Sequence, residues 1–175
     1  MRSIGIISDT HGVLRPPALA ALRGCDFIIH AGDVGGPAIL SELRRLAPVF
    51  AVRGNSDKGR WAKKLPEREI IEVENYLIYV LHNRDELDFD PQRLGFQMVI
   101  AGHSHRPSIE RRSGILHFNP GAAGPRRFTL PVTVGRLALS RGELKANIID
   151  LGGEVASPVN SAGRILREIL SRFAR

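Results

Sequence analysis

Near its start the chain reads Arg2-Ser-Ile-Gly-Ile-Ile-Ser-Asp-Thr-His-Gly12, and the rest of the sequence is organised around the end of this stretch. Its apolar residues, Ile4 to Ile7, are typical of a strand that is buried on both faces of a sheet. Asp9 and His11 follow at alternate positions, so an extended backbone would point both side chains to the same side. In open α/β sheets, ligands bind at the carboxyl ends of the strands. The stretch therefore predicts a carboxylate and an imidazole at a ligand-binding edge, with Gly12 turning the chain away.

The same pattern, an apolar run followed by a polar side chain that can bind a metal, recurs along the chain. It gives Asp33 after residues 27–29, Asn55 after 49–52, His82 after 76–81, and His103 with His105 after 98–101. The intervals suit one strand plus one crossover, so the ends of successive strands can meet at a common edge. Asp-x-His alone would be more typical of a helix N-cap beside a surface histidine. Five such runs in register favour a shared site.

Composition predicts one domain over residues 1–175, with a core over about 3–150. Hydrophobic residues at 43% and charged residues at 25% are ordinary for a globular protein of 175 residues. No apolar run approaches the ~18 residues of a membrane span, and the apolar patch at the N-terminus is too short for a secretory signal. These features predict a cytoplasmic protein without membrane association. The single Cys25 excludes an intramolecular disulfide and a thiolate-rich metal site.

The formal net charge of +7 favours anionic partners. Lysine and arginine are dispersed and form no long basic block, so charge leaves a nucleic acid open as a partner but does not indicate one. Charge does not identify the anion, and nothing in the sequence decides whether the chain forms homo-oligomers.

The pattern of strands and helices changes halfway along the chain. Helices are expected to begin at Pro16 and Pro37, because proline is tolerated in the first helical turn. Hairpins are expected over residues 70–81, 108–118 and 132–149, a basic loop over 58–68, and an amphipathic helix over 162–173. Helices between strands, followed by consecutive hairpins, predict an α/β fold with two sheets packed face to face and helices outside.

Two further polar groups are expected to be structural. His30 lies within a predicted strand end, three residues before Asp33. The acidic residues between Asp85 and Asp90 lack the spacing and the glycine of a calcium loop, so they predict a solvated turn and helix start.

The candidate site offers carboxylates, imidazoles and one carboxamide, and no sulfur. Its members are Asp9, His11, Asp33, Asn55, His82, His103 and His105. These ligands suit Mn²⁺, Fe, Ni²⁺, Zn²⁺, Co²⁺ or Mg²⁺. Seven ligands are too many for one tetrahedral ion but fit two ions that share a bridging carboxylate. Two ions roughly 3.5–4 Å apart can hold a hydroxide and bind the oxygens of a phosphate, and the basic charge of the chain agrees with a phosphate ester as substrate.

These motifs in this order resemble the calcineurin-like metallophosphoesterase superfamily. The shared features are Asp9-x-His11, Gly32-Asp33, Gly54-Asn55, His82 and Gly102-His103-Ser-His105. The short chain, Gly54-Asn-Ser-Asp57 and Asn119-Pro-Gly121 resemble its compact bacterial and archaeal phosphodiesterase branch. The resemblance covers roughly residues 3–150.

The resemblance implies a four-layer α/β/β/α sandwich of two mixed sheets with a dinuclear metal site at the strand ends. It implies that Asp9, His11, Asp33 and His105 hold one ion, and that Asp33, Asn55, His82 and His103 hold the other. Asp33 would be the bridge, and Mn²⁺ is the first choice of metal. A hydroxide between the ions would attack phosphorus, with Asn55 stabilising charge on the phosphoryl oxygens. Gly12 and the loop of Asn119, Gly121 and Ala122 would shape the phosphate pocket.

The chain departs from the family at one position that bears on mechanism. Many members carry a histidine after the motif asparagine, where it can protonate the leaving oxygen; here that residue is Ser56. Asp57, the usual partner of that histidine, is expected to hold the loop. Without a strong general acid, turnover should be slow except on esters with acidic leaving groups. Asn83 and Ala122 also depart from frequent family residues, without removing a ligand.

The sequence leaves three functions open. The first is a metal-dependent phosphodiesterase that acts on a small phosphate ester. The second is a non-catalytic scaffold, because this branch also resembles a subunit of the retromer coat that uses the fold for protein contacts. The third is a nuclease, which would use the basic surface. The complete ligand set favours the enzyme. Trp61, Arg126 and Arg127 could each contact a substrate or serve only in packing and solvation.

Overall fold

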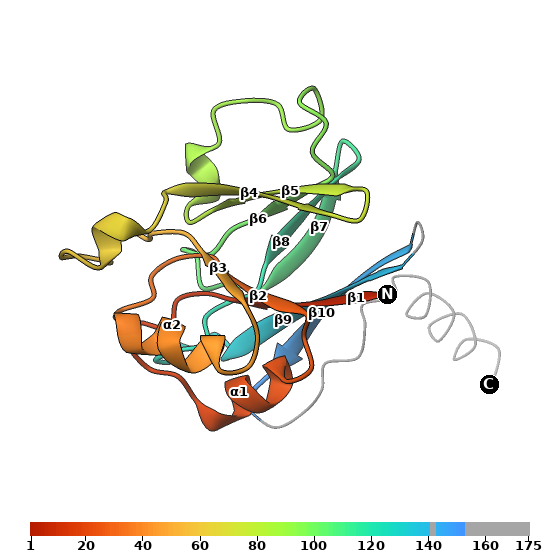
Figure 1. The fold of residues 1–175 in the computed structure, drawn as a ribbon. Helices are drawn as coiled ribbons and strands as arrows, with labels where there is room; N and C mark the ends of the chain where they lie inside the picture. The colour runs from red at the N-terminus through yellow and green to blue at the C-terminus, as the bar shows by residue number, and fades with distance from the viewer. Residues whose placement is uncertain (141–142, 153–175) are drawn as a thin grey trace, which may run out of the picture.

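The computed structural model describes residues 1–140 and 143–152, and in this part of the chain two mixed five-stranded sheets pack face to face (Figure 1). The amphipathic helix expected over residues 162–173 lies outside the described residues. The predicted α/β sandwich of two mixed sheets is confirmed.

The first sheet has the strand order β10-β9-β1-β2-β3. Its strands are β1 (Arg2–Ile7), β2 (Phe27–His30), β3 (Val49–Ala51), β9 (Thr133–Ser140) and β10 (Glu143–Asp150). β1, β2 and β3 are parallel, whereas β9 and β10 form an antiparallel hairpin against β1. The buried run from Ile4 to Ile7 thus occupies the central strand, as the sequence predicts.

The second sheet has the order β4-β5-β6-β8-β7. Its strands are β4 (Arg68–Val73), β5 (Tyr76–Leu81), β6 (Met98–Ile100), β7 (Ser108–Arg112) and β8 (Ile115–Asn119). β5, β6 and β8 are parallel, and a hairpin strand closes each edge. All three hairpins expected from the sequence are present.

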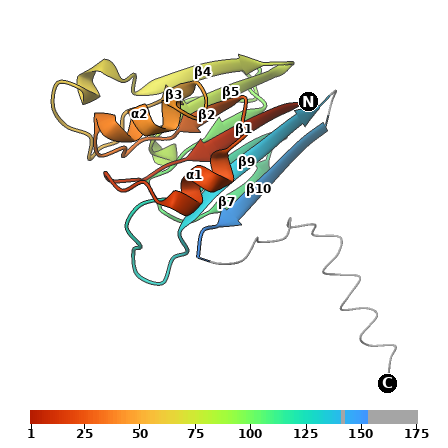
Figure 2. The same ribbon diagram turned by 60° about the horizontal axis from the view of Figure 1, so that its bottom comes forward.

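The main core lies between the two sheets. Ile4, Ile6 and Ile29 of the first sheet pack there against Met98, Ile100 and Phe118 of the second. A second apolar cluster lies beneath helices α1 (Pro16–Leu22) and α2 (Pro37–Arg44), which cover the outer face of the first sheet (Figure 2). Both helices have proline at their start, as expected.

The outer face of the second sheet is covered differently from the first. Tyr79, Val99 and Phe96 form a third apolar cluster with Leu87 and Phe89 of the segment that follows β5. Within the described residues this layer contains the short 3-10 helix η2 (Arg84–Glu86) and no α-helix. Asn83 caps η2 by accepting a hydrogen bond from the Asp85 N–H, so the acidic segment is the turn that the sequence predicts.

The basic loop after β3 contains a second 3-10 helix, η1 (Ala62–Lys64). Trp61 is partly buried against the cluster beneath the helices, which supports its packing role. None of the helices in the described residues is long and apolar enough to cross a membrane.

Candidate metal centre

The seven candidate ligands meet where the two sheets present the carboxyl ends of their parallel strands. Asp9 and His11 follow β1, Asp33 follows β2 and Asn55 follows β3 in the first sheet. His82 follows β5, and His103 and His105 follow β6 in the second. The sequence suggested one common edge; the structure forms it from the ends of two facing sheets.

One group of these side chains surrounds Asp9. The Nε2 atom of His105 lies 3.1 Å from Asp9 Oδ1, and the Nε2 atom of His11 lies 3.9 Å from the same oxygen. The two imidazole Nε2 atoms are 3.4 Å apart. A carboxylate oxygen and two ring nitrogens therefore point at one small volume, the arrangement that a metal ion requires.

A second group surrounds Asp33. The Nε2 atom of His82 lies 3.4 Å from Asp33 Oδ2 and 3.0 Å from Asn55 Oδ1. His103 Nδ1 lies 3.1 Å from the same Asn55 oxygen. Asp33 Oδ2 is also 3.7 Å from His11 Nε2, so Asp33 lies between the two groups.

In each of the two carboxylates, one oxygen accepts hydrogen bonds from the protein and the other oxygen faces the histidines. Asp9 Oδ2 accepts hydrogen bonds from the Ser8 hydroxyl (2.7 Å) and the His103 N–H (3.1 Å). Asp9 Oδ1 is buried and has no hydrogen-bond partner. A buried unpaired carboxylate oxygen is costly unless a cation compensates it, so the residues present fit a bound metal.

The ring of His82 is held in place by a hydrogen bond on the side away from Asp33. Its Nδ1 lies 2.8 Å from the buried carbonyl oxygen of Ala31, which can only accept a hydrogen bond. Nδ1 therefore carries the proton, and in the neutral imidazole Nε2 directs its lone pair at Asp33 and Asn55. A carbonyl that sets the tautomer of a histidine is a common partner of metal-binding imidazoles.

Burial and neighbouring groups shift the pKa values of three candidate ligands in different directions. Burial alone would raise the pKa of Asp33, but its contact with the His82 ring and the hydrogen bond from the Ser56 N–H hold it well below its usual range. Burial lowers the pKa of His11, which favours the neutral, ligand-competent imidazole. Burial would also lower the pKa of His82, yet its contacts with Asp33 and Ala31 raise it.

The backbone at the site differs from the extended chain that the sequence suggested. Five candidate ligands have positive φ angles: Asp9 (52°), His11 (44°), Asp33 (53°), His103 (65°) and His105 (58°). β1 ends at Ile7, so the convergence of Asp9 and His11 was predicted correctly but for the wrong reason. The left-handed conformation is unfavourable for these residues, and such strain clusters at functional sites.

Glycines that precede ligands are required by close approach between neighbouring strand ends. A Cβ on Gly54 would lie 2.1 Å from Asp33 Oδ1, and a Cβ on Gly102 would lie 2.7 Å from Asp9 Oδ2. Each glycine therefore makes room for a ligand that comes from a different strand.

Asp57 is buried and accepts three backbone hydrogen bonds. Its carboxylate binds the N–H groups of Val34 (3.1 Å), Gly35 (2.8 Å) and Gly54 (2.9 Å). It thereby ties the loop after β2 to the loop after β3, as the sequence predicts. Ser56 is exposed, and its hydroxyl lies 3.4 Å from His11 Nδ1.

The residues expected to shape the phosphate pocket lie around this centre, with most of their polar groups already paired. The Gly12 N–H donates to the Val34 carbonyl (2.9 Å), and the Gly121 N–H donates to Asn119 Oδ1 (2.9 Å). The Asn119 amide donates to the Gly102 carbonyl (2.7 Å) and lies 3.0 Å from Ser104 Oγ. Ala122 is buried in a bridge to Val132. These residues therefore brace the loops behind the ligands.

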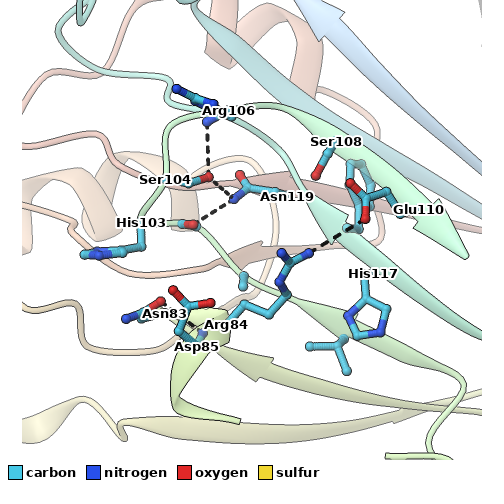
Figure 3. Close-up of a pocket in the computed structure, with 14 residues that line it drawn as sticks. Asn83, Arg84, Asp85, His103, Ser104, Arg106, Ser108, Glu110, His117 and Asn119 are labelled. Atoms are coloured by element: carbon cyan, nitrogen blue, oxygen red, sulfur yellow. Dashed lines mark hydrogen bonds and ion pairs between the residues drawn. The ribbon is translucent and has the colours of Figure 1, made fainter. Parts of the chain in front are cut away.

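A cavity of about 370 Å³ opens beside His103, on the side of the second sheet (Figure 3). Sequence reasoning missed its polar lining, which includes Arg84, Ser104, Glu110 and His117. The sequence does carry a signal for this lining, because Ser108 and Glu110, and likewise His117 and Asn119, are two residues apart and therefore share one face of paired strands.

Arg127, which the sequence left open as a substrate contact, lies close to the ligand cluster. Its positive charge contributes to the lowered pKa of His11, although burial is the larger cause.

The comparisons with known proteins agree with this geometry. A family model described as calcineurin-like phosphoesterase superfamily domain matches residues 1–142. A probable metallophosphoesterase of Methanothermobacter thermautotrophicus is 32% identical to this chain, in a match that covers 90% of this chain and 97% of the relative. The phosphodiesterase MJ0936 of Methanocaldococcus jannaschii is 27% identical, over 84% and 99% of the two chains. The structure of vacuolar protein sorting 29 from Cryptosporidium parvum has the same fold, with a TM-score of 0.73 and 19% identity over 85% and 91%. The chain belongs to the calcineurin-like phosphoesterase superfamily.

Proposed function

We propose that this protein is a metal-dependent phosphodiesterase that uses two divalent ions. The observation that carries the proposal is the pair of ligand groups around Asp9 and Asp33, which lie close enough to share ligands. Asp9, His11, Asp33 and His105 would hold one ion. Asp33, Asn55, His82 and His103 would hold the other, with Asp33 as the bridge.

Bound divalent ions would supply a water-derived nucleophile at neutral pH and a Lewis acid for the phosphoryl oxygens. The residues of the chain have separate tasks. Asp9 and Asp33 provide negative charge that is fixed by hydrogen bonds to their outer oxygens. Asn55 is exposed at the mouth of the site, so its side-chain amide can stabilise charge on a phosphoryl oxygen.

The exposed Ser56 hydroxyl occupies the position beside His11 and is a poor acid at neutral pH. We therefore infer a preference for esters with acidic leaving groups. Oxygen and imidazole nitrogen donors suit Mn²⁺, which is our first choice of metal. Ni²⁺, Fe, Zn²⁺, Co²⁺ and Mg²⁺ suit the same donors, and a cytoplasmic location stays a prediction.

The test is hydrolysis of bis(p-nitrophenyl) phosphate and p-nitrophenyl phosphate by metal-stripped protein refilled in turn with Mn²⁺, Ni²⁺, Zn²⁺ and Mg²⁺. We expect metal-restored cleavage that favours the diester. Asp33→Asn should lower kcat/KM by more than about 100-fold and leave fewer than two bound ions, because even outer partners of metal ligands contribute about 10–100-fold. The exposed Asp88→Asn should change neither quantity. Two bound ions with no cleavage would contradict the proposal.

A scaffold is the second candidate, supported by the likeness to vacuolar protein sorting 29. A scaffold does not need unpaired charge at a ligand cluster, whereas Asp9 Oδ1 is buried without a partner. A nuclease is the third, supported only by the net charge of +7. Binding of RNA or DNA that weakens steeply with salt would favour it.

A further inference from the structure

We propose that the cavity beside His103 binds one alcohol arm of the substrate, and that this arm is a neutral, polyhydroxylated group such as glycerol or a sugar. The inference rests on the proposed phosphodiesterase function, because it assigns the substrate class of that same site. A phosphodiester has two alcohol arms, and a phosphate at the ligand cluster would place one of them next to His103.

The cavity and the candidate metal centre share one loop, residues 102–106. His103 lines the cavity, and its ring also contacts Asn55 among the candidate ligands. Ser104 follows in the same loop and is held by the Asn119 amide (Figure 3). An arm attached to a phosphate at the candidate ligands would therefore start next to the cavity.

The charges in the cavity cancel, which argues against a charged arm. Arg84 and Arg106 contribute two positive charges, and Asp85 and Glu110 contribute two negative charges. The Arg84 guanidinium reaches across the cavity to within 3.9 Å of the Glu110 carboxylate (Figure 3). A second anionic group would meet the carboxylates, and a cationic group would meet the arginines.

Donors and acceptors alternate along the lining, which argues for hydroxyl groups. The cross-strand pair Glu110 and His117 combines a carboxylate acceptor with an imidazole, and Ser108 adds a hydroxyl on the same strand as Glu110. A hydroxyl both donates and accepts, so it satisfies such neighbours better than an amine, a carboxylate or an alkyl chain. An alkyl arm would desolvate these groups without replacing their hydrogen bonds to water.

The lining and size of the cavity agree with a compact polyol. Val99 and Ala101 give the lining an apolar part that can pack against the C–H groups of a sugar or glycerol. A volume of about 370 Å³ is at the lower end for small-molecule sites. It suits one short arm better than a polymer.

The experiment compares two diesters that differ only in hydroxyl groups, glyceryl p-nitrophenyl phosphate and propyl p-nitrophenyl phosphate. In both, water adds to phosphorus and p-nitrophenolate leaves, so the leaving group is constant. We expect kcat/KM to favour the glyceryl ester by about tenfold, because each recovered hydrogen bond contributes a few-fold. Glu110→Gln should lower this ratio a few-fold, because it removes one of the hydrogen-bond acceptors. Glu42→Gln, a similarly exposed glutamate outside the cavity, should leave the ratio unchanged.

A second measurement does not depend on turnover. Titration of metal-loaded protein with glyceryl phosphate and propyl phosphate should give about tenfold tighter binding of the glyceryl compound in the native protein and a preference a few-fold smaller in Glu110→Gln. Equal cleavage of both esters would overturn the cavity assignment while the phosphodiesterase proposal stands. If neither ester is cleaved, the phosphodiesterase proposal fails. Equal binding of the two monoesters would then overturn the cavity assignment as well.

Discussion

At the scale of single residues, the site is defined by which atoms are left free rather than by which are paired. Asp9 and Asp33 each use one carboxylate oxygen in hydrogen bonds and present the other to histidines. The left-handed backbone of five candidate ligands makes this arrangement costly for the fold. Metal binding would offset that cost.

Ser56 gives a prediction about the leaving group. Ser56→His would place an imidazole next to His11, at the position where a general acid is missing. We expect the rate on diesters with poor leaving groups to rise toward the ~10²-fold that general acid catalysis contributes, with little change on p-nitrophenyl esters. The measurement is kcat/KM over a series of leaving groups of rising pKa.

Ser56→Ala is the matched control and should leave the dependence on leaving-group pKa unchanged. An equal rise on all esters in Ser56→His would mean that residue 56 does not face the leaving oxygen.

At the scale of elements, some neighbouring strand ends approach each other so closely that only a glycine, which has no side chain, fits between them. Gly54, after β3, packs against Asp33, after β2. Gly54→Ala should therefore push Asp33 away from His82 and destabilise the fold by about 1–3 kcal/mol, the usual cost of overpacking. That corresponds to a fall in Tm of about 2–12 °C for a chain of this size, together with weaker metal binding.

Gly36→Ala is the control, because nothing lies within 4 Å of the position that its Cβ would occupy. Its Tm should stay within about 1–2 °C of the native value, as for most surface substitutions. Similar losses in both variants would show that backbone freedom, and not the approach to Asp33, is what the glycine provides.

Elements with a clear hydrophobic period were the predictable part of the fold. Strands β1, β2 and β5, the three hairpins and the starts of both α-helices follow from apolar runs, turns and prolines in the sequence. The convergence of the candidate ligands could be predicted because each follows such a run. The left-handed turns at Asp9 and His11 were not, because tertiary contacts such as the His11 N–H to the Asp33 carbonyl impose them. The cavity beside His103 was also missed, since its lining comes from three segments that only the second sheet brings together.

At the scale of the whole molecule, His30 makes stability depend on pH. It is fully buried, its Nε2 lies 2.9 Å from the Thr10 hydroxyl oxygen, and burial lowers its pKa to about 4. In the unfolded chain its pKa is about 6.5, so as pH falls below 6.5 the unfolded state binds the proton first. Between pH 6.5 and 4 this group should remove about 3 kcal/mol from the free energy of unfolding.

Denaturant unfolding of metal-free protein at a series of pH values tests this linkage. His30→Gln should be less stable than the native protein at pH 8, and the difference should shrink as pH falls to 4. Parallel pH profiles for the two proteins would mean that His30 does not cause the acid sensitivity.

The candidate metal centre joins the two sheets, so metal binding should stabilise the whole molecule. Asp9, Asp33 and Asn55 come from the ends of the first sheet, and His82, His103 and His105 from the ends of the second. A ligand that binds only the folded state stabilises it by about 2.7 kcal/mol per site at a free concentration of 100 Kd. For one site this corresponds to a rise in Tm of about 5–11 °C.

The measurement is the Tm of chelator-treated protein as a function of Mn²⁺ concentration, with Asp33→Asn as the comparison. The native protein should gain stability continuously with Mn²⁺, and the variant should gain less because the carboxylate between the two ligand groups is gone. If Mn²⁺ left the native Tm unchanged, the strain and the unpaired Asp9 oxygen would need another explanation, and the dinuclear site itself would be wrong.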